Sequence, residues 1–213
     1  MPWRPGSSTH FQLPQLYIDM GKEYFDYFKT EYPEKGDLII SEPFLPDPNF
    51  ERSVILICEH DTNGSFGFVL NHLSTLKFEE VIAEAGEYTD DLLVGGPVQQ
   101  DTVHMIHRCP ELVENSQQVQ EGIWWGGDFE KTLFLLNTNQ IRKSDVKFFI
   151  GYSGWSEGQL KDEVEAKSWI VYKQPTPEQV FDLEPDALWR QILNDKGGKF
   201  RLFSNYPADP RLN

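Results

Sequence analysis

From Asp37 onward the chain is a series of short strand-like runs separated by a few helix-like ones, and this succession limits the folds it can adopt. A β-hairpin is predicted between "SVILICEH" and "GFVLN", because the Asn63-Gly64 pair between them tolerates positive φ. Other strands are expected at "DLIIS", "DLLVGG", "TVHMIHR", "QQVQEGIWWGG", "VKFFIGY" and "SWIVYK". Helices are expected at "LKFEEVIAEAG", "DFEKTLFLLN", "SEGQLKDEVEA", "PEQVFDL" and "EPDALWRQILND". Asp128 is expected to be the N-cap of the second of these, and Leu188, Trp189 and Ile192 are expected to dock the last one on the domain. The pattern favours an α+β protein with a mixed sheet over a doubly wound parallel one.

The breaks between these runs are short, so we expect one compact domain over residues 36–213, preceded by an N-terminal extension over residues 1–35. In the extension, Leu16, Met20, Tyr24 and Tyr27/Phe28 recur at helical spacing before "YPEKG", which reads as a stop. We therefore predict an N-terminal helix that follows a disordered start and packs on the domain or on a partner.

The charge of the chain limits its partners. Asp and Glu number 34 against 19 Lys and Arg, which gives a formal net charge of -15. Because nucleic-acid affinity depends on Lys and Arg that neutralise phosphates, neither direct DNA binding nor binding to anionic membranes is expected. No apolar run is long enough to span a bilayer, and the N-terminus lacks the apolar segment of a signal peptide. We expect a cytoplasmic protein with reduced cysteines.

The stretch "GWSEG" around Ser156 fits the G-x-S-x-G pattern of hydrolase nucleophiles. Such an enzyme needs a histidine after the serine, yet all five histidines precede it: His10, His60, His72, His104 and His107. A structural interpretation is better supported, because Ser156 and Gln159 have the spacing of a helix capping box. Gly151 and Gly154 would then let the chain turn sharply from strand to helix while Trp155 enters the core.

Two further patterns suggest chemistry only weakly. "VGGPVQQD" lacks both phosphate-loop signatures, so a tight turn at Gly95 and Gly96 is expected, with a small anion on its N–H groups as the alternative. Cys58 and His60 would share one face of a strand, but zinc and iron sites usually show closer ligand spacing. We expect Cys58 to be an inert buried side chain, and we expect no metal and no cofactor.

Three blocks of the chain resemble a known family of bacterial proteins and occur in the family's order. The blocks are "GDLIISEPFLPDPNFERSVILICEHDTNGSFGFVLN", "GGPVQQDTVHMIH" and "KFFIGYSGWSEGQLKDEVEAKSWI". The family that they resemble is the YqgE/AlgH family. The resemblance implies an α+β domain with a bifurcated, barrel-like mixed sheet and flanking helices. Lys147 departs from the arginine frequent in the family, and the helix before Gly36 is longer than the family leads one to expect. The family pattern falls on Pro43, Asp47, Pro48, Phe50, His60, Gly64, Gly67, Asn71, Gly95, Gly96, Pro97, Val98, His107, Gly151, Tyr152, Gly154, Trp155, Gln159, Leu160, Glu163 and Trp169.

About function the resemblance implies little. The family label of transcriptional regulator of alginate synthesis comes from one branch, and this sequence has neither a helix-turn-helix signal nor the charge for DNA. The matching residues are mostly Gly, Pro, Asn and aromatic, types that shape turns and surfaces. We therefore expect a regulatory or binding protein, without catalysis, that acts through a protein partner or a small ligand.

The expected groove for that ligand or partner depends on whether the matching segments converge. Its candidate residues are Asp47, His60, Asn71, Gly95, Gly96, His107, Tyr152, Trp155 and Gln159. The alternative is a hydrolase or lyase that uses His60 or His107 as a general base near the "GGP" turn. That alternative requires the two histidines to lie within reach of each other in one pocket.

Overall fold

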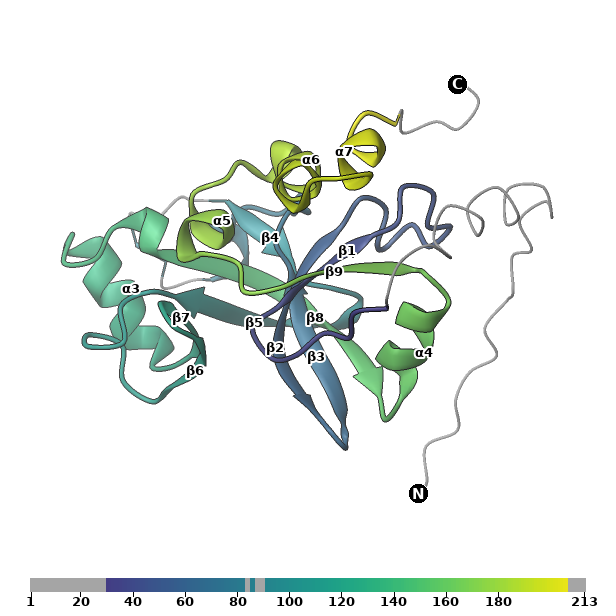
Figure 1. Cartoon of the computed structure of the whole chain (residues 1–213). Coiled ribbons are helices and arrows are strands. Elements are labelled where there is room, and N and C mark those ends of the chain that lie inside the picture. The colour runs from purple at the N-terminus through teal and green to yellow at the C-terminus, as the bar shows by residue number, and fades with distance from the viewer. Residues whose placement is uncertain (1–29, 83–84, 87–90, 207–213) are drawn as a thin grey trace.

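A computed structural model describes residues 30–82, 85–86 and 91–206 of the 213-residue chain (Figure 1). The strands form a single mixed sheet in the order β6-β7-β5-β8-β3-β2-β1-β9, and β4 pairs with β8 outside this path. All pairings are antiparallel apart from the parallel pair of β4 and β8. The strands are β1 (Leu38–Ser41), β2 (Val54–Asp61), β3 (Gly64–Val69), β4 (Leu92–Val94), β5 (Val98–His107), β6 (Ser116–Gln120), β7 (Ile123–Gly126), β8 (Val146–Ser156) and β9 (Trp169–Tyr172).

The predicted α+β class is confirmed, and among the described strands the sheet stays open, with β6 and β9 at its two ends. The helix expected at Leu16–Phe28 lies outside the described residues. The helices are α2 (Phe78–Val81), α3 (Phe129–Asn137), α4 (Gln159–Glu165), α5 (Pro177–Phe181), α6 (Pro185–Lys196) and α7 (Phe200–Phe203), with a short 3-10 helix, η1 (Lys143–Asp145). Within the described ranges, none of them has the length and apolar character needed to cross a membrane.

The sheet divides at β8. The first half of this strand, up to Ile150, pairs with β5 on one side and with β4 on the other. The second half, from Ser153, pairs with β3 instead. Gly151 lies between the halves at φ +64, and a Cβ there would lie 2.6 Å from the carbonyl oxygen of Val98. Only glycine fits this close approach of two backbones, so the bifurcation implied by the resemblance is observed and has a local cause.

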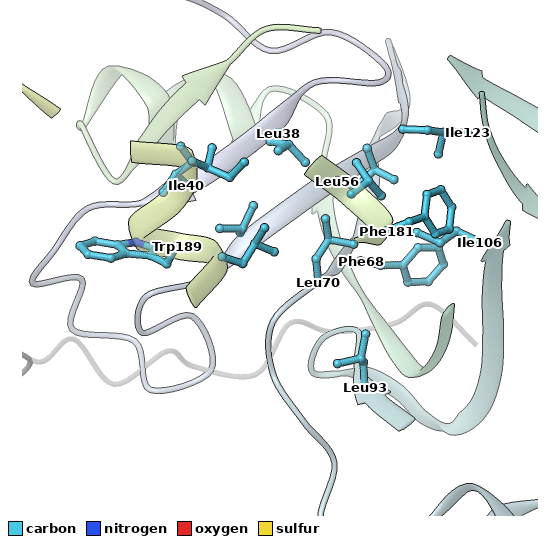
Figure 2. Close-up of a cluster of buried hydrophobic side chains, with 14 of the residues drawn as sticks. Leu38, Ile40, Leu56, Phe68, Leu70, Leu93, Ile106, Ile123, Phe181 and Trp189 are labelled. Atoms are coloured by element: carbon cyan, nitrogen blue, oxygen red, sulfur yellow. The ribbon is translucent and has the colours of Figure 1, made fainter. Parts of the chain in front are cut away.

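The two sides of the strands β1, β2 and β3 are both buried, which explains the continuous apolar run "VILIC". On one side, Leu38, Ile40 and Leu56 pack beneath the C-terminal helices, with Phe181 from α5 and Trp189 from α6 (Figure 2). On the other side, Ile39, Ile55, Ile57 and Val69 pack with Trp155, with Leu160 and Val164 of α4, and with Trp169 and Val171 of β9. A third cluster joins α2 and α3 to the first half of β8, through Phe78, Leu133, Phe148 and Ile150 among others.

Local signals predicted several of these elements well. The β2–β3 hairpin is present, with Asp61 paired to Gly64. Helix α3 begins after Asp128, whose carboxylate accepts a hydrogen bond from the backbone N–H of Lys131 at 3.0 Å, as the N-cap interpretation predicted. The predicted docking of α6 through Leu188, Trp189 and Ile192 is also confirmed, since all three are buried.

Three expectations about elements were wrong. "QQVQEGIWWGG" is a hairpin of β6 and β7 rather than one strand, because Gly122 adopts φ +75 and reverses the chain. The helix expected over "LKFEEVIAEAG" is the single turn α2, which ends where Ile82 becomes extended. Gly151 and Gly154 do not turn the chain into a helix, because β8 continues through them to Ser156.

Candidate functional site

The two histidines proposed as a base lie far apart in the sheet. His60 pairs with Ser65 across the β2–β3 hairpin, and Ser65 pairs with Trp155 near the end of β8. His107 pairs with Val146 at the start of β8. Nine positions of extended strand separate these two places on β8, which corresponds to about 30 Å in a straight strand. His60 and His107 therefore do not share a pocket.

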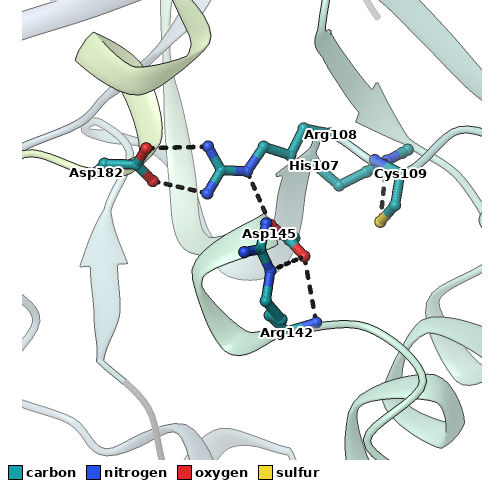
Figure 3. Close-up of polar contacts among 6 residues, drawn as sticks. All are labelled: His107, Arg108, Cys109, Arg142, Asp145 and Asp182. Carbon is teal, nitrogen blue, oxygen red and sulfur yellow. Dashed lines mark hydrogen bonds and ion pairs between the residues drawn. The ribbon is translucent and has the colours of Figure 1, made fainter.

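The two histidines also differ in their exposure to solvent. His60 is exposed, and its Nδ1 lies 2.6 Å from the hydroxyl oxygen of Ser65. His107 is completely buried, and its Nδ1 accepts a hydrogen bond from the backbone N–H of Cys109 at 3.3 Å (Figure 3). Burial lowers the pKa of His107 to about 4, against the opposing effect of the Gly126 backbone. His107 is thus a neutral core residue that a substrate cannot touch.

Next to His107, Arg108 joins three segments of the chain (Figure 3). Its guanidinium contacts both carboxylate oxygens of Asp182 at 2.7 and 3.2 Å, and its Nε donates to Asp145 at 2.8 Å. The same guanidinium lies 5.1 Å from the ring centre of Phe181. Asp145 also pairs with Arg142. These contacts hold α5 and η1 against the end of β5, which is a structural role.

Cys58 and His60 do not lie in a common environment. Cys58 is fully buried, and burial raises the pKa of its thiol well above the usual range. The register of β2 against β3 shifts between Ile57 and Glu59, and His60 beyond the shift is exposed. Across the part of the chain that the structure describes, no group of His, Cys, Asp and Glu side chains is arranged to hold a metal ion.

Trp155 and Gln159 meet at Glu163 on α4. One carboxylate oxygen of Glu163 accepts hydrogen bonds from the indole N–H of Trp155 at 2.9 Å and of Trp169 at 2.7 Å. The other oxygen accepts a hydrogen bond from the amide of Gln159 at 2.9 Å. Glu163, which sequence reasoning left among the pattern residues without a role, is therefore the centre of this network.

The capping box predicted at Ser156 is half present. The side-chain oxygen of Gln159 accepts a hydrogen bond from the backbone N–H of Ser156 at 3.1 Å, as predicted. The hydroxyl of Ser156, however, donates to that same oxygen at 3.1 Å and does not cap the helix. The N-cap position of α4 is Gly158, in the left-handed conformation, because β8 extends further than expected.

Asp47 belongs to the same structural region through its loop. Its carboxylate accepts hydrogen bonds from the backbone and side-chain N–H groups of Asn49 at 2.9 and 3.0 Å, and its carbonyl accepts one from the N–H of Phe50. This turn places the ring of Phe50 edge-on to Trp169, with 5.5 Å between ring centres, and nearly parallel to Trp155 at 6.5 Å. Asp47 therefore shapes a loop that covers the two indoles.

Gly95, Gly96 and Tyr152 meet at the point where the sheet divides. The backbone N–H of Gly95 donates to Ile150 at 2.8 Å, and its carbonyl accepts hydrogen bonds from Val69 N–H and the Ser153 hydroxyl. A Cβ on Gly96 would lie 2.3 Å from the backbone of Tyr152. The turn thus uses its glycines for close packing on β8, and the Gly95 N–H is not available to an anion.

Asn71 lines an open hollow of about 210 Å³. Its side chain holds the hollow's wall in place, since it accepts a hydrogen bond from Val54 N–H and donates one to the carbonyl of Arg52, both at 2.8 Å. The other side of the hollow is the N-terminal part of α6. The lining residues are Glu51, Arg52, Asn71, His72, Pro185, Asp186, Trp189 and Arg190.

The guanidinium of Arg52 is held by contacts with other parts of the chain. It lies 4.8 Å from the ring centre of Trp189 and donates to the backbone carbonyl of Tyr206. Its Nε is buried and has no hydrogen-bond partner among the described residues. Burial and then the positive charge of Arg190 lower the pKa of Arg52. Sequence reasoning missed both arginines, because no local pattern joins them.

The comparisons with known proteins agree with the fold. The profile of the AlgH-like family matches residues 38–201. A UPF0301 protein of Cytophaga hutchinsonii is 41% identical over 180 residues, covering 84% of this chain and 98% of the relative. A UPF0301 protein of Chlorobaculum parvum is 43% identical over 183 residues, covering 86% of this chain and 97% of the relative.

Solved structures show the same architecture. The solution structure of the AlgH protein from Pseudomonas aeruginosa superposes with a TM-score of 0.65 at 25% identity, covering 84% of this chain and 98% of that one. A crystal structure of a Corynebacterium diphtheriae protein gives a TM-score of 0.68 at 23% identity, covering 86% and 97%. The matched profile, the curated relatives and the bifurcated sheet together establish that this chain belongs to the AlgH-like family.

Proposed function

We propose that the chain is a cytoplasmic binding protein without catalytic activity, and that its ligand or partner presents a carboxylate to the hollow between Arg52 and Arg190. The observation that carries this proposal is the Arg52 side chain, which lines an open hollow and whose buried Nε has no hydrogen-bond partner among the described residues. A buried donor left unpaired costs free energy, so an acceptor from outside the chain is favoured at this place.

The charges of the hollow support the same chemistry. Burial is the main cause of the lowered pKa of Arg52, and repulsion by the positive charge of Arg190 is the second. A carboxylate placed between two guanidinium groups relieves this repulsion and fits their fork of N–H donors. Glu51 and Asp186 also line the hollow, but both are exposed, so solvent weakens their repulsion of an incoming anion.

The histidine of the same hollow is engaged by the protein's own groups. His72 lines it, and burial lowers the pKa of His72. The Nε2 of His72 lies 3.2 Å from the Ser53 hydroxyl and 3.1 Å from the carbonyl of Glu51, so its proton is directed to that carbonyl. Ser53 itself is fully buried and out of reach of a substrate. These contacts favour binding over hydrolysis.

The surface beside the hollow favours a partner with some apolar area. The segment that leaves Asn71 and His72 carries Leu73 and Leu76, which are 48% and 49% exposed. Trp and Arg are also the residue types enriched in the energetic centres of protein interfaces. A ligand that combines a carboxylate with an apolar part therefore matches this side of the molecule.

The test is a titration of the full chain with acetate, succinate, glutamate and a short acidic peptide, followed by NMR or calorimetry. Arg190→Gln should weaken binding about tenfold, the loss of one charge-assisted contact. Arg142→Gln is the matched control, since Arg142 is 77% exposed and pairs with Asp145 elsewhere. Equal weakening in both variants, or no binding of any of these carboxylates to the wild type, would refute the proposal.

A further inference from the structure

A second hollow, of about 60 Å³, gathers positive charge on this acidic chain. The lysines Lys167, Lys196 and Lys199 line it, together with Glu31, Thr30 and the ring of Phe200. Lys167 follows α4, while Lys196 and Lys199 lie between the end of α6 and the start of α7, so two segments distant in the sequence converge on one place. Three lysines beside one another are unexpected where acidic residues outnumber basic ones, 34 to 19.

These lysine side chains are partly buried and are held by contacts with neighbouring residues. All three are half-buried, and the side chain of Lys196 is only 16% exposed. The ammonium groups of Lys196 and Lys199 lie 5.0 and 5.3 Å from the ring centre of Phe200. Burial, and then the positive charge of Lys167, lower the pKa of Lys199 to about 8.

The chain itself shows which chemistry this hollow accepts. The carboxylate of Glu31 enters it and pairs with Lys196 at 2.9 Å, and the ammonium of Lys167 donates to the hydroxyl of Thr30 at 2.9 Å. The Glu31 side chain is 51% exposed, so it can leave without uncovering a core. Three ammonium groups and one carboxylate leave a charge near +2 among the described lining residues.

We infer that this hollow binds a phosphate group, which contacts Lys167 and Lys199 and competes with Glu31 for Lys196. A phosphate carries between one and two negative charges at neutral pH, which matches the charge of the lining residues. The hollow, of about 60 Å³, has room for a group of this size. The source of the group is either inorganic phosphate or a small phosphomonoester, since both present the same oxygens.

Because Glu31 competes with phosphate, some substitutions should weaken phosphate binding and one should strengthen it. Inorganic phosphate and glycerol phosphate are titrated separately into the full chain in a buffer free of phosphate, with sodium chloride added to matched ionic strength as the reference. Lys167→Gln and Lys199→Gln should each weaken binding about tenfold. Glu31→Gln should strengthen it several-fold, because the internal competitor is removed. Whichever of the two compounds binds more tightly identifies the source.

Lys161→Gln is the matched control, because Lys161 lies on α4, is 62% exposed and pairs with Glu165 away from the hollow. NMR titration of the lysine side chains gives a second readout, since bound phosphate should raise the pKa of Lys199 again. Glu31→Gln changes an exposed residue and keeps the test valid if a lysine variant fails to fold. Equal weakening by Lys161→Gln, no gain from Glu31→Gln, or an equal effect of sodium chloride would each overturn the inference.

Discussion

Glu163 accepts a hydrogen bond from the indole N–H of Trp169 at 2.7 Å, and the same oxygen serves the indole of Trp155. Trp155 and Trp169 are both buried, so each N–H depends on this carboxylate. Glu163→Ala should lower the free energy of unfolding by about 2–4 kcal/mol, because two buried donors lose their acceptor. Urea denaturation measures this loss. Glu165→Ala on the exposed side of α4 is the control, with an expected loss below about 1 kcal/mol. A loss from Glu163→Ala no larger than that of the control would contradict the role given to this carboxylate.

Ser156→Ala should be nearly neutral, within about 0.5 kcal/mol, because the hydroxyl donates only to the exposed side chain of Gln159. A capping serine would have cost about 1 kcal/mol, which is the value that the sequence pattern alone predicts. Gln159→Ala should cost more than Ser156→Ala, since Gln159 contacts both Ser156 and Glu163. Thermal or urea unfolding of the two variants decides the order, and a larger loss from Ser156→Ala would restore the capping interpretation.

Gly151→Ala should be severely destabilising, by more than about 3 kcal/mol, because a Cβ would meet the Val98 carbonyl at 2.6 Å in addition to the cost of positive φ. Gly158→Ala is a matched control: its φ of +75 is similar, and nothing lies within 4 Å of a Cβ there. It should cost only about 1–2 kcal/mol, the backbone penalty alone. Equal losses in the two variants would show that the contact at the division of the sheet is unimportant.

The pH dependence of stability should reveal His107. Its pKa is about 4 in the folded chain, while an unfolded histidine has a pKa near 6.5. Between these values the unfolded state binds the extra proton, so the free energy of unfolding should fall as the pH drops from about 6.5 to 4. The loss is at most about 3 kcal/mol. Above pH 7 histidine is neutral in both states and contributes no slope.

The measurement compares urea unfolding of the wild type and His107→Gln at a series of pH values. The carboxylates titrate in both proteins, so their contribution cancels in the difference between the two curves. That difference should shrink as the pH falls through the window and stay constant above it. A difference that does not change with pH would mean that His107 is not held neutral by burial.

Sequence reasoning succeeded where a few neighbouring residues decide the structure. Asp128 identified the start of α3, and the spacing of Leu188 and Ile192 identified the buried face of α6. It failed at Gly151, because the role of that glycine depends on the backbone of Val98, a contact made only once the sheet has formed. The same limit explains why "QQVQEGIWWGG" was taken for one strand: the turn at Gly122 is a single weak signal.

For the candidate site, the sequence indicated Asn71, but it did not indicate Arg52, Arg190 or the lysines of the second hollow. These side chains come together because β2, α4 and α6 belong to or pack on a common sheet. Their spacing along the chain does not indicate that they are close in space. The residues of the family pattern could be recognised in the sequence because local structure fixes their residue type. Gly95 and Glu163 satisfy local geometry and local hydrogen bonds, which constrain residue type strongly.

Strand β8 is shared by both halves of the sheet, and this determines which strands unfold together. Both halves of the sheet pair with this one strand, so β3, β4 and β5 all lose their hydrogen bonds to it when β8 detaches, while the pairs β1–β2, β2–β3, β1–β9, β5–β7 and β6–β7 do not depend on it. Amide protons of β3, β4, β5 and β8 should therefore exchange with solvent deuterium together, in one cooperative opening event, and more slowly than those of the edge hairpin β6–β7.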